Sequence, residues 1–220
     1  MDSLKTNNRD RLVSVAKAAS GALPFIGSAV SELLDSVVPN LRFERVVSFL
    51  QTLDERVSKV DAELNSFKRN LNTEQGTDLL EEALVQSSRA VSEERRQRLA
   101  SLTEKALTGD KLKYEEAKKI LNLYRELTDP EVVWLIYYSL RPSLSHGPHT
   151  EWVEKHPDVL RPISREMSAP IEKRELAALQ DSYKETLLRF GLTEMKGKSA
   201  SLTTLGRMLV NYITDIDEQS

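Results

Sequence analysis

The most regular hydrophobic pattern in the chain runs from Phe43 to Leu71, where apolar residues recur at alternating spacings of three and four. Charged residues, among them Asp54 and Arg56, occupy the positions in between, as expected for solvated flanks. Such spacing is typical of the a and d positions of a heptad repeat, which keep one narrow apolar stripe of a helix against a partner helix. The stripe, called the seam below, consists of Phe43, Val46, Leu50, Leu53, Val57, Val60, Leu64, Phe67 and Leu71.

The seam predicts one continuous helix from Leu41 to Leu71, roughly 45 Å long at a rise of about 1.5 Å per residue. A second apolar segment, Leu79–Leu107, follows it, and Thr73 is placed to cap the start of this segment. The seam can therefore pack against the next helical arm of the same chain, or it can form an interface with a second copy or another protein partner. Both interpretations stay open, and we rank packing within the same chain ahead of an interface with a partner.

Two helices rich in small residues are expected ahead of the seam, at Arg9–Ala19 and Ile26–Val38, with Gly21 and Pro24 breaking the chain between them. Their small side chains allow close approach, so we expect a helical hairpin. The longest uncharged stretch, Ala18–Ser31, lies here and is shorter than the roughly 20 apolar residues that a membrane-spanning helix needs. No secretory signal is expected, because the first residues are polar and charged.

Beyond the stop at Gly109 we expect two further helices, Tyr114–Leu127 and Val132–Leu140. The second is apolar nearly all round, which indicates burial on every side. Thr128 followed by Pro130 supplies a start signal for it, because proline fits the first turn of a helix.

Prolines and glycines punctuate residues 141–170, which predicts an irregular connection with one short helix. A helix over Ile171–Phe190 follows, then two short strands, Leu192–Met195 and Ser199–Leu202, and a closing helix over Thr203–Ile213. The residues of the long helix that we expect to point inward are Leu176, Leu179, Tyr183, Leu187 and Leu188.

These elements predict an all-α protein with one small β-hairpin, organised in three parts. Residues 1–40 form the small-residue helical hairpin, residues 41–128 a long helical arm or bundle, and residues 129–220 a C-terminal domain. The composition favours helix, because glycine and proline number only eight each among 220 residues. With 40% hydrophobic and 30% charged residues, the chain can bury a core.

Charge and cysteine content narrow the functional classes. The net charge is −3 and neither half of the chain is basic, which argues against strong nucleic-acid binding. The chain has no cysteine, so disulfides, thiolate zinc sites and cysteine nucleophiles are excluded. A cytoplasmic location fits this absence, and we expect it.

No motif in the sequence predicts catalysis. Phosphate-cradling glycine loops, GxSxG elbows and HExxH helices do not occur. The three histidines, His146, His149 and His156, share a Gly/Pro-rich loop with Glu151 and Glu154, and a loop does not fix metal-ligand geometry as a helix would. We therefore expect no catalytic residue, no metal, no cofactor and no small-molecule substrate.

Two segments near the C-terminus resemble the end of many bacterial winged-helix domains. They are Leu187-Leu188-Arg189-Phe190-Gly191-Leu192 and Ser201-Leu202-Thr203-Thr204-Leu205-Gly206-Arg207-Met208-Leu209. The resemblance implies a winged-helix-like domain over residues 129–220, in which the helix before the wing and the wing itself contact DNA where such domains bind it. The candidate contacts are Lys173, Arg174, Lys184, Arg189, Lys196 and Lys198. Acidic residues interleave with them, so DNA binding is not favoured.

The whole layout also resembles that of bacterial proteins related to the abortive-infection Abi-alpha group, whose C-terminal domain follows a helix start like Glu126–Leu135. We expect a non-enzymatic protein that oligomerises or binds a protein partner through the seam, and the resemblance implies a role in phage defence. Two alternatives stay open: a dimeric winged-helix DNA-binding regulator, and a membrane-acting effector that releases its N-terminal segment. The membrane contacts of the effector would be Leu23, Phe25, Ile26 and Val30.

Overall fold

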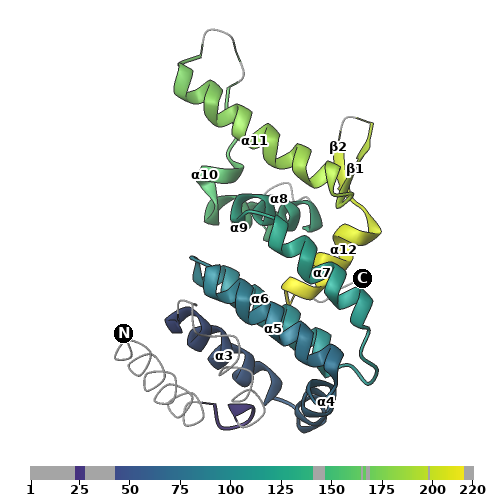
Figure 1. Ribbon diagram of the computed structural model, residues 1–220. Helices are drawn as coiled ribbons and strands as arrows, with labels where there is room; N and C mark the ends of the chain where they lie inside the picture. Colours follow the sequence, from purple (N-terminus) through teal and green to yellow (C-terminus); the bar gives the residue numbers. More distant parts are fainter. Residues whose placement is uncertain are drawn as a thin grey trace, which may run out of the picture. The chain divides into compact units, whose positions relative to one another are not determined.

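The computed structural model describes residues 23–27, 43–140, 147–164, 166, 169–197 and 199–215. In this part of the chain ten helices and two short strands follow one another (Figure 1), so the expected all-α fold with one small β-hairpin is confirmed. The chain divides into two compact units. Unit 1 extends to Asn122 and takes in the segment from Tyr212 onward, whereas unit 2 comprises Leu123–Asn211.

The division into units differs from the three parts expected from the sequence. Its first boundary falls at Asn122 inside α7 (Tyr114–Glu126), and its second falls before Tyr212 inside α12 (Thr204–Ile213). Because both boundaries lie within helices, no stretch of linker composition marks them. The hairpin expected at residues 1–40 lies outside the described residues, apart from residues 23–27.

Unit 1 is a helical bundle in which α6 packs against three other helices. Its first four elements are α3 (Phe43–Val57), α4 (Asp61–Leu71), α5 (Glu74–Arg89) and α6 (Glu93–Thr108). Large side chains from all four are fully buried between them, among them Phe49, Phe67, Leu80 and Leu99. The second helical arm therefore folds back on the first, as the internal interpretation of the seam predicts.

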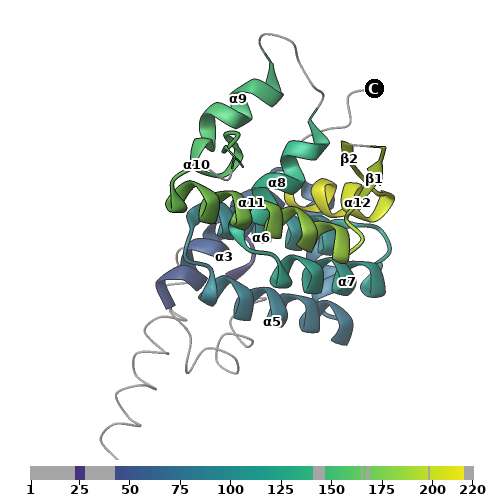
Figure 2. The same cartoon turned by 90° about the horizontal axis from the view of Figure 1, so that it is seen from above.

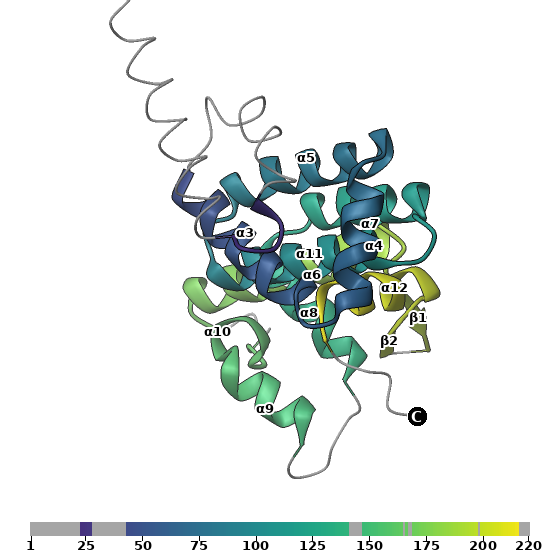
Figure 3. The same ribbon diagram turned by 90° about the horizontal axis from the view of Figure 1, so that it is seen from below.

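The single helix expected over residues 41–71 is wrong, because the chain breaks between α3 and α4. Val60 has an extended backbone (φ −134°, ψ 121°) and is 47% exposed, so it leaves the seam. Ser58 donates its hydroxyl to the carbonyl of Glu55 (3.3 Å), a local bond that competes with helix continuation. Asp61 then opens α4 favourably, because its carboxylate meets the positive end of the helix dipole. Figure 3 shows α4 turning away from the axis of α3.

The starts of α5 and α6 follow from local capping chemistry, and the cap at Thr73 is the predicted one. The hydroxyl of Thr73 accepts the backbone N–H of Gly76 (3.0 Å), and the hydroxyl of Ser92 accepts that of Arg95 (3.2 Å). Position 76 also requires glycine, because a Cβ there would lie 2.0 Å from the carbonyl oxygen of Asn70. The turn from α4 into α5 can therefore be this tight because glycine has no Cβ.

Unit 2 is organised around α8, which contacts three helices and one strand. Its elements are α8 (Asp129–Ser139), α9 (Pro148–Lys155), α10 (Pro157–Leu160), α11 (Ile171–Arg189), β1 (Thr193–Lys196), β2 (Ser199–Leu202) and the part of α12 up to Asn211. Figure 2 shows α11 running alongside α8. Two short helices, α9 and α10, stand where one was expected.

The start signal and the burial predicted for α8 are both confirmed. The carboxylate of Glu131 accepts the backbone N–H (2.6 Å) and the hydroxyl (2.9 Å) of Thr128, which closes the first turn. Residues 131–136 are all buried, so this helix is the core of unit 2.

The predicted hairpin is confirmed, with β1 shifted by one residue. The strands pair antiparallel, with Thr193 opposite Leu202 and Lys196 opposite Ser199. Gly197 in the turn has φ +67°, a conformation that favours glycine.

The junction between the hairpin and α12 depends on a second close approach. The hydroxyl of Thr203 accepts the backbone N–H of Gly206 (3.0 Å), so Thr203 caps α12. A Cβ at position 206 would lie 2.0 Å from the carbonyl oxygen of Leu192. Glycine at this position therefore lets α12 begin directly against the chain that enters β1.

Candidate interaction surface

Helix α11 is held in unit 2 by a buried amide as well as by apolar side chains. Gln180 is 4% exposed, and its Nε2 donates to the carbonyl oxygens of Val159 (2.8 Å) and Arg161 (2.9 Å). Ala177 and Leu187 are buried too. The amide satisfies carbonyls at the C-terminal end of α10 that have no helical partner, which is why a polar residue of α11 faces the core.

The prediction that Leu176 and Leu179 point inward is wrong, because both are 49% exposed. Ala177 and Gln180, one residue further along in each case, take the buried side instead. Ile171 is 58% exposed on the same helix. We call Ile171, Leu176 and Leu179 the α11 apolar surface; all three lie in the first half of α11.

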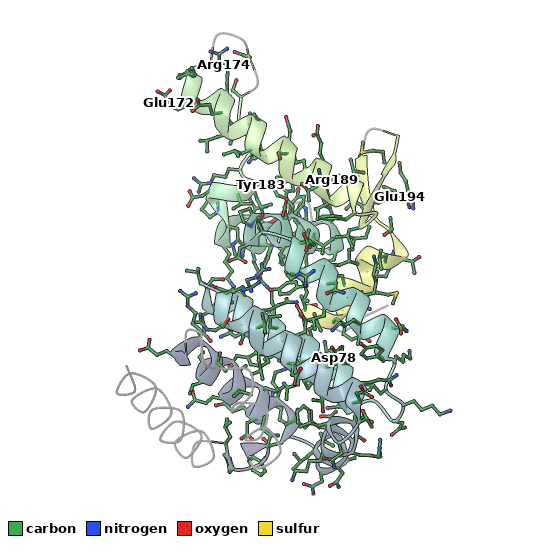
Figure 4. All side chains as sticks on the ribbon, in the orientation of Figure 1. Asp78, Glu172, Arg174, Tyr183, Arg189 and Glu194 are labelled. Atoms are coloured by element: carbon green, nitrogen blue, oxygen red, sulfur yellow. The ribbon has the colours of Figure 1, made fainter. Side chains whose placement is uncertain are left out.

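Charged residues around this surface are balanced. Lys173 and Arg174, two of the expected DNA contacts, are exposed, but so are the adjacent Glu172 and Glu175. Figure 4 places Glu172 and Arg174 together at the N-terminal end of α11, and the exposed Arg189 toward its other end. No basic stripe forms on the described part of this helix, so it lacks the local positive charge that a phosphate backbone selects.

The other basic candidates differ in their surroundings. The ammonium group of Lys184 lies 4.3 Å from the ring centroid of Trp134, which fastens α11 to α8 by a cation–π contact. On the hairpin, Lys196 pairs with Glu194 at 3.1 Å. Lys198 lies outside the described residues. Lys184 and Lys196 thus have partners within unit 2, which weakens the case for a phosphate-binding wing.

Aromatic side chains form a cluster on α8 that extends to α9. The ring of Trp134 lies 5.3 Å from that of Tyr137 and 5.8 Å from that of Tyr138, and His149 of α9 lies 4.2 Å from Tyr137. Burial raises the pKa of Tyr138 to about 12 and also raises the pKa of Tyr137. Both phenols stay protonated at neutral pH, so the cluster serves packing.

The two described histidines, His149 and His156, lie against different aromatic rings. His149 packs on Tyr137, and His156 lies 4.2 Å from the ring of Trp152, whose Nε1 donates to the carbonyl of Val133 (3.1 Å). His146 lies outside the described residues. Over the described ranges, no group of three or more His, Cys, Asp or Glu residues is placed to hold a metal ion.

The seam lies inside unit 1. Its fully or almost fully buried members are Val46, Leu50, Leu53, Val57, Phe67 and Leu71. Leu64 is half-buried, and the side chain of Phe43 lies outside the described part. The helices that carry the seam pack on α5 and α6, so its buried members contact helices of their own chain.

The four candidate membrane contacts do not share one environment. Leu23 is 2% and Ile26 0% exposed, Phe25 is 43% exposed, and Val30 lies outside the described residues. Asp54, expected on a solvated flank, is only 4% exposed, and its Oδ1 accepts the backbone N–H groups of Phe25 (3.1 Å) and Ile26 (2.9 Å). This carboxylate ties the short segment to α3. Among the described helices none has the length and apolar character to cross a membrane.

A second unexpected charge contact joins α3 to α6 and the C-terminal segment. Arg56 Nη2 lies 2.9 Å from Glu104 Oε2 and 2.5 Å from Asp215 Oδ1. The bond from Arg56 lowers the pKa of the more exposed Asp215. Burial raises the pKa of Glu104 by more than the bond from Arg56 lowers it. The network ties Asp215 to α3 and α6 within unit 1.

Unit 1 also has one open pocket of about 430 Å³ among its described residues. Its lining is Gln75, Leu112, Lys113, Tyr114, Glu115 and Glu116. Beside it, Asp78 accepts the hydroxyl of Tyr114 (2.8 Å) and the ammonium of Lys118 (2.6 Å). Figure 4 labels Asp78. Burial acts to raise the pKa of Asp78, but these two bonds lower it overall. The same bond raises the pKa of Tyr114, which makes this phenol a poor general base.

Comparisons with models of protein families, with curated proteins and with solved structures found no match. The resemblances to winged-helix domains and to the Abi-alpha group therefore stay predictions from the sequence. The observed order of α11, β1, β2 and α12 is the order that the winged-helix resemblance implies.

Sequence reasoning missed the α11 apolar surface, although a signal for it exists. Ala177, Gln180, Lys184 and Leu187 are spaced by three, four and three residues, which describes a helix face as regular as the one through the leucines. When only hydrophobicity is considered, a face that contains glutamine and lysine is a weaker candidate for the buried face of α11 than a face of leucines. The carbonyls of Val159 and Arg161, to which Gln180 donates, cannot be inferred from the sequence.

Proposed function

We propose that this chain is a non-enzymatic protein-interaction protein that binds a protein partner through the α11 apolar surface. The exposure of Ile171, Leu176 and Leu179, on a helix whose other side is buried, is the observation that carries the proposal. Clusters of exposed large apolar side chains with polar neighbours are typical of protein-binding sites. Helices commonly present such clusters to a groove or to another helix.

The charge balance around the surface favours a protein over DNA. Glu172 and Glu175 are as exposed as Lys173 and Arg174, so approaching phosphates would meet both signs. The DNA-binding regulator is therefore the weaker candidate. A place in phage defence rests on the sequence resemblance alone.

A photo-crosslinking amino acid at position 179 tests the proposal in cells that express the full chain. The expected result is a covalent adduct of defined mass above the 24.9 kDa of the chain. Position 91 is the matched control, because Val91 is an isolated apolar residue of unit 1 that is 78% exposed. The adduct should be absent at position 91, and it should be lost from position 179 when Leu176→Asp is added.

No adduct at position 179, or equal yields at positions 179 and 91, would contradict a binding role for this surface. The mass of the adduct then separates two kinds of partner. Twice the mass of the chain indicates a second copy, and any other mass indicates a different protein.

A further inference from the structure

The exposed side of α11 carries a regular stripe that includes Leu179 of the α11 apolar surface. Its members recur at spacings of three, four, three, four and three residues, so they lie on one face of the helix. They are Glu172, Glu175, Leu179, Ser182, Thr186 and Arg189. All are exposed except Thr186, which is half-buried. This is a heptad-type stripe that no described element covers.

Charge is distributed unevenly along this stripe. Its first two positions, Glu172 and Glu175, are acidic, its last position, Arg189, is basic, and the middle is uncharged. Figure 4 shows Glu172 and Arg189 toward opposite ends of α11. Within the described part of the chain none of the three forms an ion pair; the guanidinium of Arg189 only lies over the ring of Phe190, at 5.4 Å. Their charges therefore remain available to a partner.

We infer that the partner of α11 is a second copy of this chain, docked antiparallel through the same stripe. The stripe is symmetric about its midpoint, so a two-fold axis there sets Glu172 against the partner's Arg189, and Arg189 against the partner's Glu172. Leu179 then meets the partner's Ser182 near the axis. This inference rests on the proposed protein-binding role of α11 and names the occupant of its surface.

The apolar flank fits the same arrangement. Leu176 and Tyr183 both lie on one side of the stripe, and antiparallel pairing brings Leu176 of each copy toward the partner's Tyr183. A parallel pair would instead align Glu172 with Glu172 and Arg189 with Arg189, and like charges at a helix interface are unfavourable. The pattern therefore selects one orientation as well as one partner.

The size of the contact sets the expected strength of the dimer. From Glu172 to Arg189 the stripe is roughly 25 Å long, which places the interface in the small class typical of weak, transient complexes. We expect association on the order of tens of micromolar, which shows as a mass that rises with concentration.

Charge reversal on the full chain tests the inference by sedimentation velocity at low ionic strength, where surface charges are least screened. Glu172→Arg and Arg189→Glu should each raise the dissociation constant of the dimer by about tenfold or more, because each sets like charges face to face. An equimolar mixture of the two variants should restore wild-type association, since both contacts become attractive in the mixed dimer. The double variant Glu172→Arg/Arg189→Glu should also associate like the wild type.

Lys173→Glu is the matched control, because Lys173 is exposed on the same helix but lies off the stripe. It should leave the dissociation constant unchanged, and the helical content of every variant should match the wild type by circular dichroism. A wild type that remains at 24.9 kDa at the highest concentration would overturn the inference. So would a dimer that ignores both reversals, or single variants that do not associate when mixed.

The two proposals fail separately. A monomeric wild type with a crosslinked adduct of another mass at position 179 removes self-association and leaves the protein-binding role intact. A monomeric wild type without any adduct removes both.

Discussion

Two regions of this chain carry apolar helical stripes, and they differ in what covers them. The seam on α3 and α4 packs on α5 and α6, and its members Leu50 and Leu53 are fully buried. The long helix α11 buries Gln180 on one side and leaves Leu176 and Leu179 half exposed on the other. Apolar spacing predicts burial for both, yet the seam belongs to a core, whereas Leu176 and Leu179 belong to a surface.

The difference shows that periodicity identifies an apolar face of a helix but does not identify which element packs on that face. In unit 1 the next two helices supply that cover. In unit 2 a polar contact decides the orientation of α11, because Gln180 satisfies the carbonyls of Val159 and Arg161 and so turns the leucines outward. This arrangement outweighs the exposure of a few apolar groups, because the buried amide of Gln180 would be costly to leave without a hydrogen-bond partner.

The largest expected effect is the difference in free energy of unfolding between a leucine-to-alanine substitution in the seam and one on α11. Leu50→Ala should lower the free energy of unfolding by about 3 kcal/mol, because it leaves a cavity in a closed core. Leu179→Ala should change it by less than about 0.5 kcal/mol, because the side chain already contacts solvent. Urea denaturation of both variants measures the contrast, and equal losses would show that both stripes are core.

A somewhat smaller effect is expected at the junction of β1 and α12. Gly206→Ala should destabilise unit 2 by about 2 to 3 kcal/mol, because the added methyl group collides with the carbonyl oxygen of Leu192 and backbone must shift. Gly109→Ala is the control, since a Cβ there would make only an ordinary contact of 3.5 Å with Lys111. Thermal unfolding compares them, and similar melting temperatures would argue against the tight junction.

The link between Asp54 and the segment at residues 23–27 comes next. Asp54→Ala should free this segment with a loss of about 2 kcal/mol, because two backbone N–H groups lose a charged acceptor. Hydrogen exchange of the Phe25 and Ile26 amides should then become faster, whereas Asp54→Asn, which keeps an acceptor oxygen, should have a smaller effect. Unchanged exchange in Asp54→Ala would mean that the carboxylate does not hold the segment.

The smallest effect is a dependence on acid. Asp78 has a pKa below its ordinary value in the folded protein, so it stabilises the fold above about pH 4, and this contribution is lost as the pH falls through the lowered pKa. Asp78→Asn should make the melting temperature less sensitive to acid. The corresponding contribution to the free energy of unfolding should be less than about 1 kcal/mol, because the carboxylate is partly exposed. Identical acid profiles of the two proteins would contradict this contribution.

Much of the fold could be predicted from the sequence, because its signals are local. Thr73 caps α5 where the sequence predicts a cap, and α8 is buried as its uniform hydrophobicity predicts. Local chemistry of this kind depends on a few neighbouring residues. Element types and starts therefore followed from spacing and capping.

The rest depends on contacts between residues far apart in the chain. The break before α4 passes through Val60, which fits the heptad pattern yet leaves it. Asp54 and Arg56 read as solvated flank positions, but their partners lie near residue 25 and at Glu104 and Asp215. The outward turn of α11 likewise needs the carbonyls of α10. None of these partners can be inferred from the spacing of apolar residues.

The most direct test of the contrast between the two stripes joins light scattering with circular dichroism for two double variants of the full chain. With an internal seam, Leu53→Asp plus Val57→Asp should lose helical signal, because two charges enter a closed core. With an outward α11, Leu176→Asp plus Leu179→Asp should keep wild-type helicity and stay at 24.9 kDa at every concentration. Two results together would contradict the assignment of core and surface. They are a seam variant that stays folded and only dissociates, and an α11 variant that unfolds.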